Sequence, residues 1–226
     1  MARVSSDVII SYDGTANDDD ALVLGRLLAG DSTRLALAYI RHAPEFDPQR
    51  EELARHDAER RLEQGAARLG NPDLPRYVVF SASTGAGLED LAKTQGASLI
   101  VFGSDYRTPP GHAEPTTSAQ RLLEIGGIAT AVAAAGMRAS PDRKIGVIAV
   151  PAVTEDGAAQ QTAEALAPKL GAKVLTAEAA DADLIVVGSQ PGAPAGRVVL
   201  SGAARTMLDA SRGSVLVVPA GKPLRL

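Results

Sequence analysis

Residues 97–104 read ASLIVFGS, and residues 182–189 read ADLIVVGS, 85 positions further along the chain. Each stretch is a short apolar run, rich in β-branched residues, that ends in Gly-Ser. Such a run is typical of a strand buried in a parallel sheet with both faces covered. Its return at a fixed distance predicts an internal repeat, which sets how the rest of the chain is divided.

Around the first copy, short apolar runs alternate with longer helical patterns. The expected strands cover residues 8–12, 35–40, 77–82, 99–102 and 128–134. The expected helices cover residues 17–28, 48–69, 87–93 and 118–124. This alternation predicts βαβ units and therefore an α/β fold, with a Rossmann-like parallel sheet sandwiched by helices.

After a polar segment at 136–143, which we interpret as a linker, the pattern restarts. The expected strands now cover residues 145–150, 184–187 and 215–218, and the expected helices cover 155–170 and 204–208. Aligning residues 9–12 with 146–149, an offset of 137, leaves the second copy about 52 residues shorter than the first. We therefore predict a complete domain over 1–138 and a shortened one over 139–226, packed as a pseudo-dimer.

Residues 173–177 look like a further strand, but few residues separate them from the strand at 184–187. A parallel crossover usually needs a dozen residues or more. Two interpretations stay open, namely an irregular edge segment and an antiparallel strand.

Composition excludes several classes of protein. The chain has no cysteine, a net charge of −4 and 3% aromatic residues. It therefore has no disulfides, thiolate metal sites or cysteine nucleophiles, and it lacks the basic footprint of a nucleic-acid-binding protein. Because it has neither a signal-peptide pattern nor an apolar run of about 20 residues, we expect no membrane partner and a cytoplasmic location.

Three loops are expected where ligands bind in such sheets, beyond the carboxyl ends of the strands. They contain, in order, Asp13, Gly14 and Thr15; Gly103, Ser104 and Arg107; and Thr116, Thr117 and Ser118. The hydroxyls of the third loop have two interpretations. They can cap the following helix, or they can border a helix N-terminus that holds a phosphate.

These loops carry a resemblance to the universal stress protein family. Asp13-Gly14-Thr15 after the first strand, GLEDLA at 87–92 and ASLIVFGS at 97–104 are similar to that family's motifs. The resemblance covers nearly all of 7–136 and implies an adenine-nucleotide-α-hydrolase-like fold that binds ATP, with Mg²⁺ accompanying it. It also implies that Asp13 contacts the adenine or ribose end and that Thr117 lies at the phosphates.

The chain departs from the family pattern in the phosphate loop. Tyr106 and Thr116 stand where the family has glycine, and glycine there lets the backbone approach a phosphate closely. In the second copy Pro191 and an inverted Ser201-Gly202 occupy the loop, and Val150-Pro151 replaces Asp13-Gly14. We therefore expect a degenerate ATP loop in the first domain and none in the second.

Three aspartates at 18–20 begin the first helix. They can complement its dipole, or they can hold Mg²⁺ beside a triphosphate. Without a metal they would repel phosphates. Histidine occurs only at 42, 56 and 112, with no spacing typical of a metal site or a catalytic triad. We therefore assign no catalytic residue and no metal ligand.

The function expected from this combination is a regulatory, stress-response binding protein similar to universal stress proteins. Two alternatives remain: an ATP-hydrolysing enzyme of the adenine nucleotide α-hydrolase-like group, and a nucleotide-free protein-interaction module. The fifth strands, 128–134 and 215–218, are expected to pair within one chain, because an exposed fifth strand would be an aggregation-prone edge. A homodimer of whole chains stays open.

Overall fold

Short, mostly apolar stretches of three to seven residues form the strands of one sheet in the computed structural model. The structure describes residues 7–31, 33–42, 44–125, 127–152, 157–176, 182–210 and 212–226. The strands are β1 (Val8–Ser11), β2 (Leu35–Arg41), β3 (Arg76–Phe80), β4 (Leu99–Phe102), β5 (Ala129–Val132), β6 (Val147–Ala149), β7 (Lys173–Leu175), β8 (Leu184–Val187) and β9 (Ser214–Val217). Their order across the sheet is β3-β2-β1-β4-β5-β9-β8-β6-β7. Every neighbouring pair is parallel except β5 and β9, which are antiparallel.

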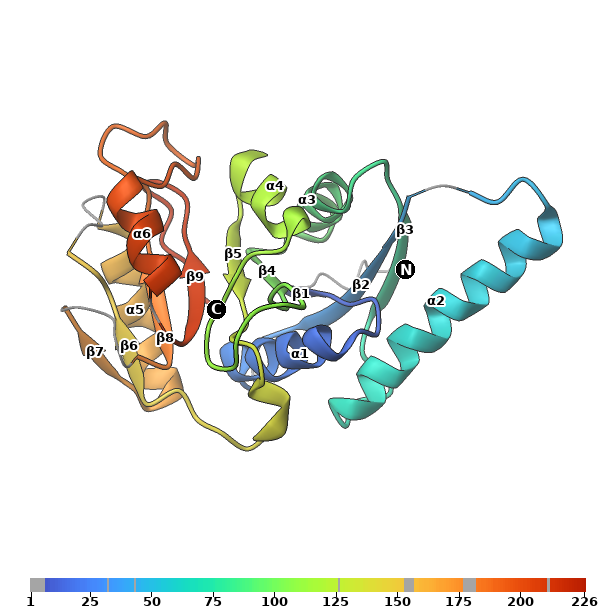
Figure 1. The fold of residues 1–226 in the computed structure, drawn as a ribbon, viewed down its shortest axis with the longest axis horizontal. Helices are drawn as coiled ribbons and strands as arrows, with labels where there is room; N and C mark the ends of the chain where they lie inside the picture. Colours follow the sequence, from blue (N-terminus) through green and yellow to red (C-terminus); the bar gives the residue numbers. More distant parts are fainter. Residues whose placement is uncertain are drawn as a thin grey trace.

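Helices cover both faces of this sheet (Figure 1). They are α1 (Ala16–Ala29), α2 (Pro48–Arg68), α3 (Thr84–Gln95), α4 (Thr117–Ile125), α5 (Ala158–Leu170) and α6 (Gly202–Ala210), with a short 3₁₀ helix η1 (Met137–Ala139). Local signals set their ends. The Asp47 carboxylate accepts the N–H groups of Gln49 and Arg50 to begin α2, and Gly96 ends α3 with a φ of 71°. The α/β fold predicted from the sequence is therefore confirmed.

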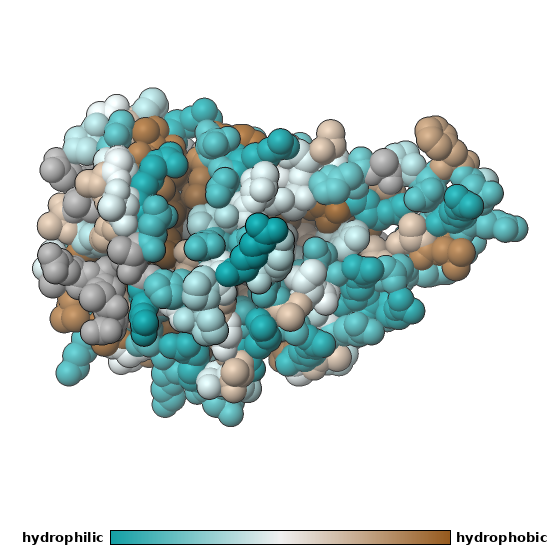
Figure 2. Space-filling view, viewed as in Figure 1, coloured by the Kyte–Doolittle hydropathy of each residue, from teal (hydrophilic) through white to brown (hydrophobic). Residues whose placement is uncertain are grey.

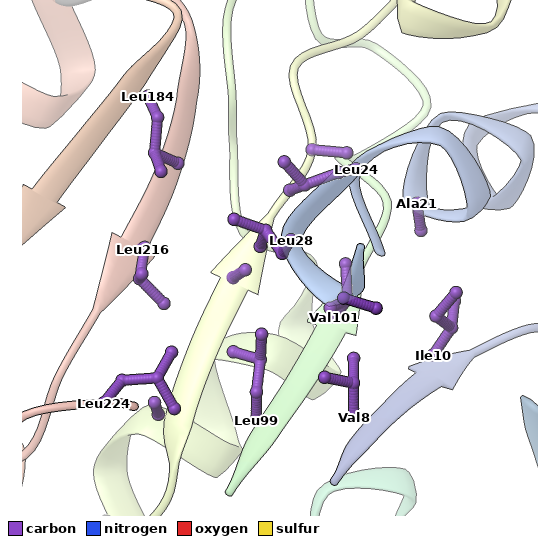
Figure 3. Close-up of a cluster of buried hydrophobic side chains, with 14 of the residues drawn as sticks. Val8, Ile10, Ala21, Leu24, Leu28, Leu99, Val101, Leu184, Leu216 and Leu224 are labelled. Carbon is purple, nitrogen blue, oxygen red and sulfur yellow. The ribbon is translucent and has the colours of Figure 1, made fainter. Parts of the chain in front are cut away.

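Two large apolar clusters fill the two interfaces between sheet and helices. One packs α1, α2 and α5 on one face, and the other packs α3 and α4 on the opposite face. Figure 3 shows Leu28 of α1 directed toward Leu99 and Val101 of β4, with Leu216 and Leu224 directed into the same region. The first cluster thus contains side chains from both ends of the chain.

The surface of the molecule is hydrophilic over α2 and shows hydrophobic residues in the hollow between α6 and α4 (Figure 2). A groove of about 410 Å³ lies there, and Leu123, Leu200 and Leu208 are among the residues that line it. These leucines are only partly buried against the sheet. The described surface therefore has an apolar groove above β5 and β9.

The β8–β9 pair repeats the register of β4–β5. Leu99 lies opposite Ala129, and Leu184 lies opposite Ser214, so both partners are shifted by the same 85 positions. The loop bonds repeat as well, because Gly111 N–H donates to Ala135 O and Gly196 N–H donates to Ala220 O. The domain boundary at 138/139 stays a prediction.

The offset of 137 between β1 and β6 is wrong. Ile148 lies opposite Leu184 as Val8 lies opposite Leu99, which corresponds to a shift of 140. Side chains alternate between faces along a strand, so an alignment that is wrong by three residues, an odd number, exchanges the two faces. The position equivalent to Asp13 is then 153 rather than 150, and 153 lies outside the described residues.

Over the described part of residues 173–177, the edge position that one interpretation predicted is confirmed, but the irregular course and the antiparallel alternative are wrong. Lys173–Leu175 pairs regularly with β6, and the pairing is parallel, with α5 as the crossover; residue 177 lies outside the described residues.

The predicted linker is tied to α1 by Asp20. Its side chain is fully buried and accepts the N–H groups of Gly136 and Arg138 at 2.9 and 2.6 Å. The Arg138 guanidinium donates to the same carboxylate at 2.6 Å. This contact fixes η1 against α1.

In the part of the chain that the structure describes, no helix combines the length and apolar character needed to cross a bilayer.

Candidate functional site

A cavity of about 340 Å³ opens at the carboxyl ends of β1, β2 and β4, and we name it the β1–β4 cavity. It is lined by Ser11, Tyr12, Asp13, Asp18, Ala38, Tyr39, Ile40, His42, Thr84, Phe102, Gly103, Thr116 and Ser118. Four residues predicted from the sequence are therefore brought together here: Asp13, Gly103, Thr116 and Ser118. The other predicted residues are not among those that line the cavity: Gly14, Thr15, Ser104, Arg107 and Thr117.

Asp13 and Asp18 form a carboxyl pair at the mouth of this cavity. Asp18 Oδ2 accepts the N–H of Asp13 at 2.7 Å, and Asp13 Oδ1 accepts the N–H of Thr15 at 3.0 Å. Burial, together with the neighbouring Asp13 carboxyl, raises the pKa of Asp18 to about 8. Asp18 therefore holds a proton near neutral pH, and a protonated carboxyl can donate a hydrogen bond as well as accept one.

The side chains of the three aspartates at the start of α1 lie in three different environments. Asp18 faces the cavity, Asp19 pairs with Arg68 and accepts from Tyr12 Oη, and Asp20 is buried against Arg138. Successive helical residues are about 100° apart, which explains the divergence. Among the described residues, no group of three or more acidic, histidine or cysteine side chains is arranged to hold a metal ion.

Gly103 is required for packing between β4 and α1. A Cβ atom at this position would lie 2.2 Å from the carbonyl oxygen of Asn17, and the Asn17 side chain donates to Ser104 O at 2.8 Å. Ser104 is buried, donates to Ala133 O at 2.6 Å and accepts the Glu114 N–H at 3.1 Å. These two residues therefore hold the loop in place, and Ser104 has both hydrogen-bonding functions occupied.

The hydroxyl loop caps its helix. Thr116 Oγ1 accepts the N–H of Ala119 at 3.2 Å, which is the capping interpretation of this loop. Ser118 is the second residue of α4 and lines the cavity, whereas Thr117 is exposed. Thr116 thus contributes to the wall of the cavity while its oxygen satisfies the helix end.

The Arg107 guanidinium lies outside the cavity. It stacks over the ring of Tyr106, which is 73% exposed, at 4.9 Å from the centroid. The Arg107 N–H donates to Asp105 Oδ1 at 3.0 Å. The tyrosine that replaces the family's glycine therefore has a cation–π partner on the protein surface.

His42 and Thr84 are among the wall residues that sequence reasoning missed. His42 follows β2, and its Nδ1 lies 3.3 Å from Ser81 O while its Nε2 lies 3.3 Å from Thr84 Oγ1. Thr84 begins α3, so these contacts join the ends of β2 and β3. The available signal was position alone, because both residues follow predicted strands of a parallel sheet.

Arg61 of α2 reaches the rim. Its Nη1 donates to Asp13 O at 2.9 Å, and its side chain also pairs with Asp57 at 2.8 Å. No lysine or arginine is among the residues that line the cavity within the described chain. The cavity therefore offers carboxyl, imidazole and hydroxyl groups, which suit hydroxyl and amine donors better than phosphates.

Comparisons with solved structures show the class of fold. A universal stress protein from Archaeoglobus fulgidus is 13% identical, with a TM-score of 0.58 over 96% of this chain and 99% of that one. A protein provisionally named as a universal stress protein, from Pseudomonas aeruginosa, is 14% identical, with a TM-score of 0.59 over 97% and 95%. A further P. aeruginosa protein of unknown function is 13% identical, with a TM-score of 0.60 over 97% and 94%.

No protein-family model matches the chain, and no curated protein matches it. At these identities the likeness concerns the fold. The chain has a universal-stress-protein-like fold, which the sequence motifs predict, and the comparisons extend over nearly the whole chain.

Proposed function

We propose that this protein is a regulatory binding protein of the stress response, similar to universal stress proteins, and that it binds an adenine nucleotide or nucleoside in the β1–β4 cavity. The observation that carries this proposal is the convergence of Asp13, Gly103, Thr116 and Ser118 on one cavity. These residues come from three loops that are distant in sequence. Fold alone does not define function, so the proposal depends on this site.

The donor and acceptor groups favour the adenosine portion. Ribose hydroxyls and the adenine amino group are donors, and the Asp13 and Asp18 carboxyls can accept from them. The volume of about 340 Å³ lies at the lower end of the range for small-molecule sites. We therefore place the ribose and base, rather than the phosphates, within the wall of carboxyl and hydroxyl groups.

The cavity offers fewer favourable contacts to the phosphates of ATP than to its adenosine portion. The acidic pair disfavours them, Ser104 is already hydrogen-bonded, and Arg107 is directed to the surface. Glycines that would let the backbone approach a phosphate are replaced by Tyr106 and Thr116. We expect adenosine to bind at least as tightly as ATP with Mg²⁺, the reverse of what a phosphate-gripping loop would give.

Calorimetric titration with adenosine, AMP and ATP with Mg²⁺ tests this, together with an assay for released phosphate. Saturable binding of adenosine without turnover supports the proposal. Turnover of ATP would instead favour the hydrolase alternative. The absence of binding by all three at millimolar concentration would leave the interaction module.

Two variants test the site. Asp13→Ala and His42→Ala should each weaken adenosine binding by about tenfold or more, the cost of losing a hydrogen bond to a charged or polar group in a cavity. Asp73→Ala is the matched control, because Asp73 is exposed in the turn before β3. An unchanged affinity in Asp13→Ala would contradict the role of that carboxyl.

A further inference from the structure

A second cavity lies at the amino ends of β4 and β5, whereas the β1–β4 cavity lies at the carboxyl ends of its strands. We name it the tail cavity. It measures about 650 Å³, within the usual range for small-molecule sites. Its wall combines the end of α3, the segments that lead into β4 and β5, and residues 219–225 after β9. Because β9 is antiparallel to β5, the carboxyl end of β9 meets the amino ends of β4 and β5 here.

The charged groups around the tail cavity are mostly cationic. Lys93 pairs with Glu89 at 2.7 Å, so these two charges offset each other. Lys222 and Arg225 also line the cavity, and neither forms an ion pair with a described residue. The wall of one cavity therefore contains two cationic residues that have no ion-pair partner among the described residues, in a chain whose net charge is −4.

The segment that carries these two cations is anchored. Leu224, which lies between them, is 3% exposed, and its N–H donates to Thr162 Oγ1 at 2.9 Å. Figure 3 shows the Leu224 side chain near the base of β5, in the same cluster as Leu99. The Lys222 N–H donates to Pro219 O at 3.1 Å and closes a turn. The cations are thus held on fixed backbone, which lowers the entropy cost of binding a ligand.

A glycine makes room for one of the cations. A Cβ atom on Gly196 would lie 2.8 Å from Lys222 Nζ, and the φ of 74° at Gly196 also suits glycine. The remaining wall is largely apolar and includes Ile128, Ala129 and Pro223. The tail cavity therefore combines an apolar floor with two positive charges on one side, which is the arrangement expected for an organic anion.

We propose that the tail cavity binds a small organic anion with at least two negative charges, held by Lys222 and Arg225. The shared chemistry is a dianion, which a phosphate ester or a dicarboxylate can supply. This site is separate from the β1–β4 cavity in position and in charge. Its ligand would not compete with adenosine, so either proposal can fail without the other.

Titration of the ¹⁵N-labelled full chain with pyrophosphate and, separately, with succinate tests the proposal by amide chemical shifts. We expect saturable shifts at Gly127, Gly221 and Lys222, which weaken as salt screens the charges. The double variant Lys222→Ala/Arg225→Ala should bind at least about tenfold more weakly. Saturation by pyrophosphate alone identifies the phosphorylated class, and saturation by succinate alone identifies the dicarboxylate class.

The matched control is Lys169→Ala/Lys173→Ala, which removes the same charge from exposed positions on α5 and β7. It should bind like the unaltered chain. Equal weakening in both double variants would mean a non-specific effect of net charge and would overturn the proposal. The proposal would also fail if neither anion gave a saturable shift, or if the shifts centred on Asp13. Adenosine affinity should be unchanged in Lys222→Ala/Arg225→Ala, which keeps this test independent of the proposed function.

Discussion

Asp18 is a titratable residue that lines the candidate site and whose pKa is set largely by burial. It lines the β1–β4 cavity and is protonated near neutral pH, because burial and the neighbouring Asp13 carboxyl raise its pKa to about 8. The ordinary value for this side chain is 3.8. The folded protein therefore binds this proton more tightly than the unfolded chain does. Stability linked to Asp18 must fall as pH rises between these two values.

Asp18→Asn should remove this dependence, because an amide resembles the protonated carboxyl and can still accept from the Asp13 N–H. From about pH 4 to about pH 9, the unaltered protein should lose at least about 1.4 kcal/mol relative to the variant. Denaturant unfolding across that range measures the difference. Asp73→Asn, at an exposed position, should follow the unaltered protein. Parallel pH curves for Asp18→Asn and the unaltered chain would contradict the raised pKa.

The site residues show what sequence can and cannot predict at this scale. Asp13 and Gly103 were predicted for one site and line one cavity, because each directly follows a recognisable strand and strand ends converge in parallel sheets. His42 and Thr84 were missed because nothing in their immediate sequence distinguishes them. Only the packing of the ends of β2 and β3 brings the imidazole to the hydroxyl.

Among the elements, the end of β4 and the start of α1 approach each other closely at the site. Gly103→Ala would place a Cβ atom 2.2 Å from Asn17 O, which is a backbone atom and cannot move aside freely. We expect a loss of about 1–3 kcal/mol, typical of overpacking, and weaker adenosine binding as α1 is displaced.

Gly202→Ala is the matched control for that substitution. Gly202 begins α6, and an added Cβ there meets no atom within 4 Å. This variant should be neutral or slightly more stable, because alanine restricts the unfolded chain. Thermal unfolding of the two variants measures the contrast. Equal stability in both would show that α1 adapts to the extra methyl group.

The positions of the strands along the chain were easier to predict than the residue-by-residue alignment of the two copies. Both copies of the LIV-rich run give strands with the predicted bounds, β4 and β8, because a continuous apolar run between polar neighbours has sharp limits. The match of 9–12 with 146–149 was wrong by three residues, because similarity between short apolar runs does not specify which face each side chain occupies. The pairing partner specifies it, and the partner is distant in sequence.

At the scale of the whole molecule, one apolar cluster joins the halves of the sheet. It contains Leu24 and Leu99 from the first half together with Leu184, Leu216 and Leu224 from the second. Because these side chains share a core, and because β5 and β9 share a ladder, the halves should unfold together. Sequence predicted which strands pair at the joint, but it could not show that the final segment crosses back to this core.

Leu216→Ala tests this coupling, since Leu216 is fully buried in β9. The substitution should cost about 2–5 kcal/mol and lower the temperature of a single calorimetric transition. Leu175→Ala, at a residue 47% exposed on the edge strand β7, should change stability little. Two separate transitions, with only one of them shifted, would mean that the halves are independent units.

The antiparallel ladder of Thr130, Ala131 and Val132 with Val217, Leu216 and Val215 has a consequence for dilution. Two separate chains that met through such strands would dissociate as their concentration fell, by mass action. Here one covalent chain supplies both strands, so the effective concentration of one for the other is set by the connecting segment and not by the cell. The nine-stranded sheet should therefore persist unchanged when the protein is scarce. The β1–β4 cavity and the tail cavity should remain at opposite ends of β4 at any expression level.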